Sequence, residues 1–148
     1  MKYFGTDGFR GEVSKKLNVN HAFAIGQYLG YHFSKTKKAR MIIGKDTRIS
    51  GDMLEHALAS GAASMGVDVY LLGVTPTPVV SYLIRKEGFD FGVMISASHN
   101  PYVDNGIKVF NGKGFKLEEE VELLIFMILV YQNMLIGYMK YVLIILRV

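Results

Sequence analysis

Hydrophobic positions between residues 18 and 122 follow two alternating patterns. Short apolar runs of four to six residues predict strands, and between them lie longer segments whose apolar residues recur at the spacing of a helix face. Strands and helices that alternate in this way build an α/β sheet with right-handed crossovers, so we predict a three-layer α/β domain. The expected helices span about residues 18–34, 51–65 and 78–86, and the expected strands span residues 41–44, 67–72, 91–95 and 106–110.

Residues with capping chemistry stand at the ends of these predicted helices. Asn18 can accept hydrogen bonds from the first turn of the first helix, and Ser50 can do the same for the second. Gly66 ends the second helix, and Pro78 lies in the first turn of the third, where a missing backbone donor costs little.

From Leu123 onward the chain changes character, since 21 of its last 26 residues are apolar. Gln132-Asn133 and Lys140 divide this stretch into pieces shorter than the roughly 18 apolar residues of a membrane span. We therefore expect no stable span. Three interpretations stay open: an altered end that is not native to the fold, a helix that is buried or covered by a partner, and a membrane contact. We predict a domain over residues 1–122 and a separate apolar tail over residues 123–148.

Composition excludes several classes of function. Half of the 148 residues are hydrophobic and a fifth are charged, which excludes global disorder. The formal net charge of +4 is too small, and its basic residues too dispersed, for a nucleic-acid surface. The absence of cysteine excludes a disulfide framework, a thiolate metal site and a cysteine nucleophile. The N-terminus lacks the apolar segment of a signal peptide, and we expect a cytoplasmic location.

Two segments rich in glycine and charge are candidate ligand loops. Residues 44–51 (Gly-Lys-Asp-Thr-Arg-Ile-Ser-Gly) follow a predicted strand, where α/β sheets bind ligands. They lack the spacing of a Walker loop, and a capped turn with a local ion pair is the simpler alternative. Residues 5–11 place three glycines around Arg10. Glycine lets a loop approach a ligand closely, and a guanidinium suits phosphate.

A third segment, residues 95–101 (Ile-Ser-Ala-Ser-His-Asn-Pro), follows another predicted strand, and we expect Ser98 on an exposed loop at the carboxyl end of that strand. The Ser98 hydroxyl is a nucleophile only if another group activates it, and His99 is its neighbour in the sequence. Residues 104–108 (Asp-Asn-Gly-Ile-Lys) begin with a turn signal. If the strand that follows returns beside the previous one, Lys108 could face Ser98. A Ser/Asn-rich turn and a nucleophile loop both stay open on these residues alone.

Taken together, these four segments resemble the α-D-phosphohexomutase superfamily in sequence, order and spacing. The resemblance covers residues 1 to about 122 and is most specific in Ser-Ala-Ser-His-Asn-Pro with the downstream Asp-Asn-Gly-Ile-Lys. It implies the first domain of that superfamily, a three-layer α/β/α unit with a mixed sheet. Within the superfamily the chain is most similar to the branch that interconverts glucosamine 6-phosphate and glucosamine 1-phosphate, so the expected partner is an amino-sugar phosphate.

The resemblance also implies roles for individual residues. Ser98 matches the serine that carries the phosphoryl group, Lys108 and Arg10 match residues of proton transfer and charge stabilisation, and His99 lies beside the phosphoserine. The family cofactor is Mg²⁺, which Ser98 would contact through its phosphate oxygen. The expected substrate and phosphate-loop residues are Thr6, Gly8, Lys45, Asp46, Arg48 and Asn100.

The chain also departs from the family pattern. It has no Asp-x-Asp-x-Asp magnesium loop, no Glu-x-Ser-Gly-His sugar loop and no Arg-x-Ser-Gly-Thr phosphate clamp. We therefore expect the first domain of a mutase with an altered end, which shows no mutase turnover as this chain alone. The tail could mediate self-association or contact with the missing domains. A different class of function stays open: a non-catalytic phosphate-binding or scaffolding module whose tail docks on a partner or a membrane.

Overall fold

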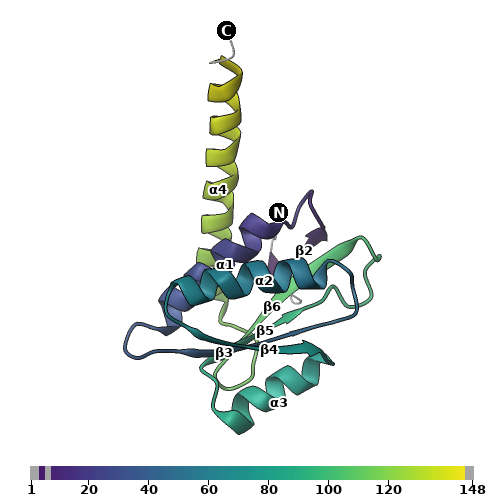
Figure 1. Cartoon of the computed structure of the whole chain (residues 1–148), viewed down its shortest axis with the longest axis vertical. Helices are drawn as coiled ribbons and strands as arrows, with labels where there is room; N and C mark the ends of the chain where they lie inside the picture. Colours follow the sequence, from purple (N-terminus) through teal and green to yellow (C-terminus); the bar gives the residue numbers. More distant parts are fainter. Residues whose placement is uncertain (1–3, 6–7, 146–148) are drawn as a thin grey trace.

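The computed structural model describes the backbone of residues 4–5 and 8–145 and the side chains of residues 8–134. One mixed sheet lies between helices on both of its faces, with α1 and α2 on one face and α3 on the other (Figure 1). This arrangement confirms the predicted three-layer α/β architecture. The elements in chain order are β1 (Phe4–Gly5), β2 (Gly8–Glu12), α1 (Val19–Phe33), β3 (Arg40–Lys45), α2 (Gly51–Ser64), β4 (Asp68–Val74), α3 (Thr77–Glu87), β5 (Phe91–Ile95), β6 (Asp104–Asn111) and α4 (Glu119–Ile145).

The strand order across the described part of the sheet is β1-β2-β6-β5-β3-β4. The three strands β4, β3 and β5 are parallel, as expected for strands joined through helices. The strand β6 instead returns antiparallel to β5, and β2 pairs antiparallel with its other edge. The sheet is therefore parallel on one side and antiparallel on the other.

The helix ends follow the capping residues, with one exception. The Asn18 side chain accepts a hydrogen bond from the backbone N–H of His21 at the start of α1. Gly88 ends α3 with a φ of 68°, a left-handed conformation that costs glycine little. The prediction that the Ser50 side chain caps α2 is wrong. Ser50 occupies the N-cap position, but its side chain makes no hydrogen bond to the helix. Its hydroxyl accepts a hydrogen bond from Asn105 instead.

Alternate residues of each strand build two hydrophobic cores. The larger core packs the sheet against α1 and α2, and it includes Phe9, Ile107 and Val109. The smaller core lies under α3, and it includes Met94 and Phe110. Because successive strand residues face opposite sides, this division also fixes the face of every polar residue on β2 and β6.

Two segments expected to be loops or turns are strands. Residues 8–12 form β2, which pairs with β6 through Arg10 opposite Gly106. The Asp104-Asn105-Gly106 string begins β6 rather than forming a turn. Its turn signal was misleading because the strand already pairs with β2 at Asp104, and tertiary pairing overrides a local preference.

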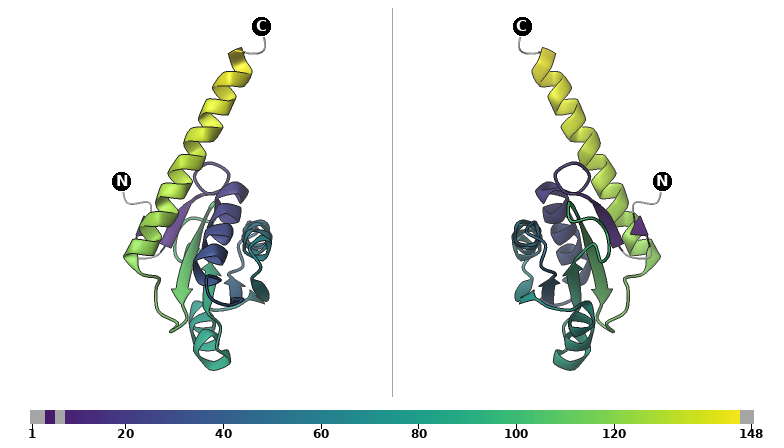
Figure 2. Two further views of the ribbon diagram at one scale, coloured as in Figure 1. Left: turned by 90° about the vertical axis from the view of Figure 1, so that its left-hand side faces the viewer. Right: turned by 90° about the vertical axis from the view of Figure 1, so that its right-hand side faces the viewer.

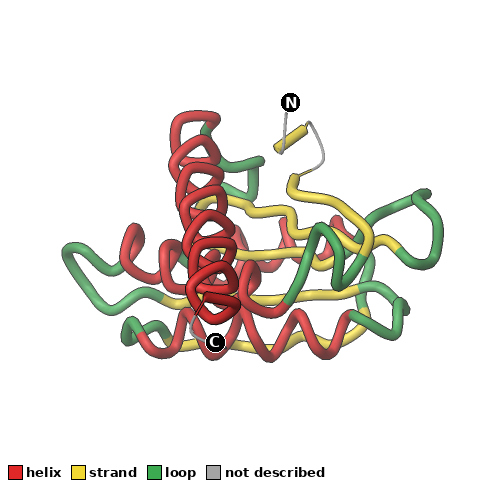
Figure 3. The backbone as a smooth tube through the Cα atoms, turned by 90° about the horizontal axis from the view of Figure 1, so that it is seen from above, coloured by secondary structure: helices red, strands yellow, loops and turns green. Residues whose placement is uncertain are grey.

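The apolar tail begins within one continuous helix, α4, which starts beside α1 and β1 and extends beyond the body of the domain (Figure 2). Seen from above, α4 lies in front of the strands of the sheet (Figure 3). The segment is helical as far as Ile145, and the three interpretations of the tail stay predictions. Ile125 and Leu129 are buried in the larger core. The helix crosses residue 122 without a break, and the boundary between domain and tail stays a prediction.

Several large apolar side chains on the described part of α4 face outward: Leu123, Leu124, Met127, Tyr131 and Met134. Within the part of the chain that the structure describes, none of the helices combines the length and apolar character that a membrane span needs.

Candidate active site

The candidate site lies at the edge of the sheet where β3 and β5 both end. The backbone N–H of Asp46, just after β3, donates to the carbonyl of Ile95, the last residue of β5, over 3.0 Å. The loop from β5 to β6 therefore starts beside the loop from β3 to α2, and both lie at the same end of the sheet (Figure 1). This edge is where ligands bind in open α/β sheets.

Ser98 is exposed on the loop between β5 and β6, as predicted. Its φ of 53° lies in the left-handed region, which is uncommon for residues other than glycine. The backbone N–H of Ser98 donates to Ser96 Oγ over 3.0 Å, and the N–H of Asn100 donates to the Ala97 carbonyl over 3.0 Å. These bonds form a tight turn that holds the Ser98 backbone at the surface.

The second half of the loop is joined to the same network by amide side chains. Asn100 Nδ2 donates to Asp104 Oδ2 over 3.0 Å. Asn105 is fully buried, and its Nδ2 donates to Ser50 Oγ over 2.9 Å while its Oδ1 accepts from the N–H of Gly106 over 2.8 Å. Asn105 thus ties the start of β6 to the start of α2.

Asp46 and Arg48 form an ion pair within the first loop. Arg48 Nε donates to Asp46 Oδ2 over 3.1 Å, and the Arg48 backbone N–H donates to Asp46 Oδ1 over 3.0 Å. The rest of the guanidinium reaches across to backbone carbonyls of the loop that carries Ser98. The local ion pair expected from the sequence is present, and it is joined to the candidate nucleophile loop.

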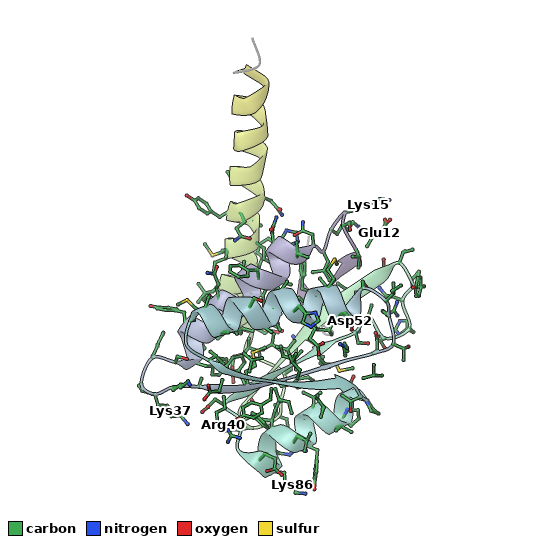
Figure 4. All side chains as sticks on the ribbon, in the orientation of Figure 1. Glu12, Lys15, Lys37, Arg40, Asp52 and Lys86 are labelled. Atoms are coloured by element: carbon green, nitrogen blue, oxygen red, sulfur yellow. The ribbon has the colours of Figure 1, made fainter. Side chains whose placement is uncertain are left out.

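Lys45 faces carboxylates of α2. Its ammonium lies 2.6 Å from Asp52 Oδ1 and also contacts Glu55, which is buried. The hydrogen bond to Asp52 and then that to Glu55 raise the pKa of Lys45, and the hydrogen bond from Lys45 lowers the pKa of Asp52. Figure 4 shows Asp52 on α2, toward the end of the sheet that carries the candidate site. The positive charge of Lys45 is thus paired within the domain.

Arg10 and Lys108 lie on one face of the sheet. Arg10 is directly opposite Gly106, and Lys108 follows Gly106 by two residues, so all three share the face of α3. A side chain at Gly106 would lie 2.8 Å from Arg10 Cγ and 2.6 Å from the Ser96 carbonyl oxygen. The glycine therefore lets the Arg10 side chain cross β6 close to the loop of Ser98. Lys108 Nζ lies 5.5 Å from the centre of the Phe110 ring.

The remaining candidates from the sequence are Gly8, His99 and Thr6. Gly8 has a φ of 87°, and a Cβ there would overlap the carbonyl of Ile107 on β6. Only glycine therefore fits at this first position of β2. His99 is exposed next to Ser98. Thr6 lies outside the described residues.

Carboxylate and histidine side chains do not gather into a metal site in the described part of the chain, where no group of three or more is found. The residues there do not by themselves fit a magnesium ion.

Most of the chain matches one known protein family. The model of phosphoglucomutase/phosphomannomutase, alpha/beta/alpha domain I, matches residues 1–130. The chain belongs to this family. Family members are phosphohexomutases, isomerases that generally depend on magnesium.

Two curated relatives of this chain are named phosphoglucosamine mutase. The protein from Lachnoclostridium phytofermentans is 63% identical over 124 residues, which cover 84% of this chain and 28% of the relative. That from Lachnospira eligens is 54% identical over 123 residues, which cover 81% of this chain and 27% of the relative. The chain thus spans little more than a quarter of the length of these relatives.

Solved structures agree with this assignment. A putative phosphomannomutase from Thermus thermophilus superposes with a TM-score of 0.75 at 32% identity, over 82% of this chain and 28% of its own. A phosphoglucomutase/phosphomannomutase family protein from Burkholderia thailandensis gives a TM-score of 0.73 at 27% identity, over 87% of this chain and 30% of its own. The fold of the family domain is therefore shared as well as its sequence.

Sequence reasoning missed several residues that shape the site. Ser96 and Asp104 lie inside the quoted motifs, but their bonds to the loop backbone and to Asn100 depend on how the loop folds. The role of Asn105 was hidden by its place in a turn-like string. Glu55 carries no local signal, because only the packing of α2 brings it to Lys45.

Proposed function

We propose that this chain carries the phosphoserine domain of a phosphoglucosamine mutase, which interconverts glucosamine 6-phosphate and glucosamine 1-phosphate. The observation that carries the proposal is the exposed Ser98, held on a tight turn at the ligand-binding edge of the sheet. The 63% identity to a named phosphoglucosamine mutase supports the choice of substrate.

The proposed reaction begins with a phosphoryl group on Ser98 Oγ. A hydroxyl oxygen of the sugar phosphate attacks the phosphorus, the bond from phosphorus to Ser98 Oγ breaks, and the proton of the sugar hydroxyl ends on the serine oxygen. The resulting bisphosphate reorients and returns its other phosphoryl group to Ser98 in the reverse step. Positioning and positive charge are the main requirements of such a transfer. We assign them to Lys108 and Arg10, which share one face of the sheet.

The remaining assignments follow the same proposal. His99 flanks the phosphoserine, and Thr6, Gly8, Lys45, Asp46, Arg48 and Asn100 are proposed to form or support the surrounding phosphate loops. A phosphoserine oxygen on Ser98 would supply one ligand to magnesium. We propose a cytoplasmic location. Self-association through α4 stays a prediction, and a mass that rises with protein concentration in sedimentation experiments would support it.

Phosphorylation of the full chain tests the nucleophile directly. The purified chain is incubated with glucosamine 1,6-bisphosphate and magnesium, and phosphopeptides are identified by mass spectrometry. We expect phosphate on Ser98, none in Ser98→Ala, and unchanged labelling in Ser60→Ala, a control on the exposed side of α2. A chain that stays unlabelled, or carries its phosphate on another serine, would contradict the assignment.

Turnover is tested in a chimera. The aligned 124 residues of the Lachnoclostridium phytofermentans enzyme are exchanged for those of this chain. We expect mutase activity in the chimera. Ser98→Ala should abolish most of it, because covalent transfer is lost, whereas Lys108→Ala should slow it severely but leave some rate. Unchanged turnover in the serine variant would exclude Ser98 as the nucleophile.

A further inference from the structure

Arg48 uses its entire guanidinium to bind the loop between β5 and β6. Besides the bond from Nε to Asp46, Nη1 donates to the carbonyls of Pro101 over 2.7 Å and Asp104 over 3.0 Å. Nη2 donates to the carbonyls of Ser98 over 2.9 Å and Asn100 over 3.0 Å. These are five hydrogen bonds, as many as a guanidinium has N–H groups.

The four carbonyls belong to both halves of the loop. Those of Ser98 and Asn100 follow the turn that exposes the candidate nucleophile, and those of Pro101 and Asp104 lead into β6. Their oxygens converge on one cation, which offsets the repulsion between carbonyl dipoles that point inward. Arg48 thereby opposes the opening of a loop in which Ser98 itself has a left-handed φ of 53°.

The same contacts limit what Arg48 can do for a substrate. Its side chain is 10% exposed, and Asp46 Oδ2 orients the fork from behind. With five donors committed to protein oxygens, the guanidinium has no N–H left for an incoming phosphate. A lysine at this position would keep the charge but would have only three donors and no planar fork.

We propose that Arg48 is a positioning residue that holds the loop of Ser98 in its phosphoryl-accepting conformation, and that it acts through the geometry of its five hydrogen bonds rather than through its charge. The inference rests on the proposed function in one respect, that Ser98 is the residue phosphorylated. It separates Arg48 from Arg10 and Lys108, which are the cations proposed to meet the phosphoryl group.

The test uses the full chain and compares Arg48→Lys with the wild type. Amide hydrogen exchange is followed by NMR at the loop amides of Ser96, Ser98, Asn100 and Asp104. The amides of β3 and β5 serve as a reference. The matched control is Arg85→Lys, because Arg85 makes an exposed bond to Ser81 on α3, away from the loop. The rate of Ser98 phosphorylation by glucosamine 1,6-bisphosphate is measured in the same samples. Each of the four loop amides donates a hydrogen bond in the folded chain, so its exchange rate reports opening of the loop.

We expect Arg48→Lys to speed exchange at the four loop amides at least tenfold, to leave the reference amides unchanged, and to slow Ser98 phosphorylation at least tenfold. Arg85→Lys should change neither. If the loop amides of Arg48→Lys exchange at the wild-type rate, the proposal is overturned, since a positive charge alone would then hold the loop. An equal rise at the reference amides, or a faster-exchanging loop with undiminished phosphorylation, would overturn it too. If the wild-type chain is not phosphorylated, the proposed function fails, while the exchange rates still decide whether Arg48 holds the loop.

Discussion

Truncation of Leu129 tests how firmly α4 is attached to the domain. This side chain is 2% exposed and belongs to the core that α1, α2 and the sheet share. The change to alanine removes the equivalent of about three methylene groups, and at about 0.8 kcal/mol for each, the loss of burial alone is about 2.4 kcal/mol. The cavity left behind raises the cost, so we expect Leu129→Ala to lower the free energy of unfolding by about 2.7–5 kcal/mol.

Leu124→Ala on the same helix is the matched control. Leu124 is 49% exposed, so about half of that burial is lost and the same truncation there should cost about 1.2 kcal/mol. Any difference in helix propensity between leucine and alanine affects both variants equally. Urea denaturation followed by far-UV circular dichroism measures the two values. Equal losses in both variants, or no loss in either, would refute the packing of α4 described above.

Four further substitutions, one of them a control, test other parts of the domain. Gly106→Ala should lower the free energy of unfolding by about 1–3 kcal/mol because its Cβ would lie 2.6 Å from the Ser96 carbonyl oxygen; Gly51→Ala, with room for a methyl group, should be neutral or stabilising in the same denaturation assay. Burial raises the pKa of Asp90, but hydrogen bonds from Lys37 and from the Arg40 backbone outweigh it and lower the pKa below 3.8. Asp90→Asn should therefore destabilise the chain at neutral pH, and its deficit in melting temperature should vanish as the pH falls through that lowered pKa. Lys45→Met should raise the pKa of Asp52 toward 3.8 in a carboxyl NMR titration, and an unchanged titration would contradict the ion pair.

Hydrophobic periodicity predicted α1, α2, α3 and the parallel strands because their signals are local. The strand β5 was predicted at its observed bounds, and α1 begins at the cap that Asn18 provides. The strand β2 was missed because its sequence, rich in glycine and containing Arg10, lacks the alternation typical of a strand. Its extended form comes from pairing with β6, a partner almost a hundred residues away in the chain.

The candidate site also has some features with local sequence signals and others that depend on long-range contacts. Ser98 and its exposure could be predicted, because the motif is contiguous and follows a strand. The contacts of Arg48 could not, since they join residues about fifty positions apart and depend on the side-by-side placement of β3 and β5. The opposite end of β3 shows the same limit: Lys37 and Arg40 lie there, near each other in Figure 4, and both bind Asp90.

The reach of Arg48 across fifty positions also has a consequence for the order of events during folding. The antiparallel pair β5–β6 is local in the chain and can form early, whereas the parallel pair β3–β5 closes a long loop and is a slower step. The bonds from Arg48 become available only when that second pair has formed. A nascent or partly unfolded chain would therefore carry the serine on an unrestrained hairpin loop. Competence for phosphorylation would then arise with the completed sheet, which makes the modified serine a marker of correctly folded molecules.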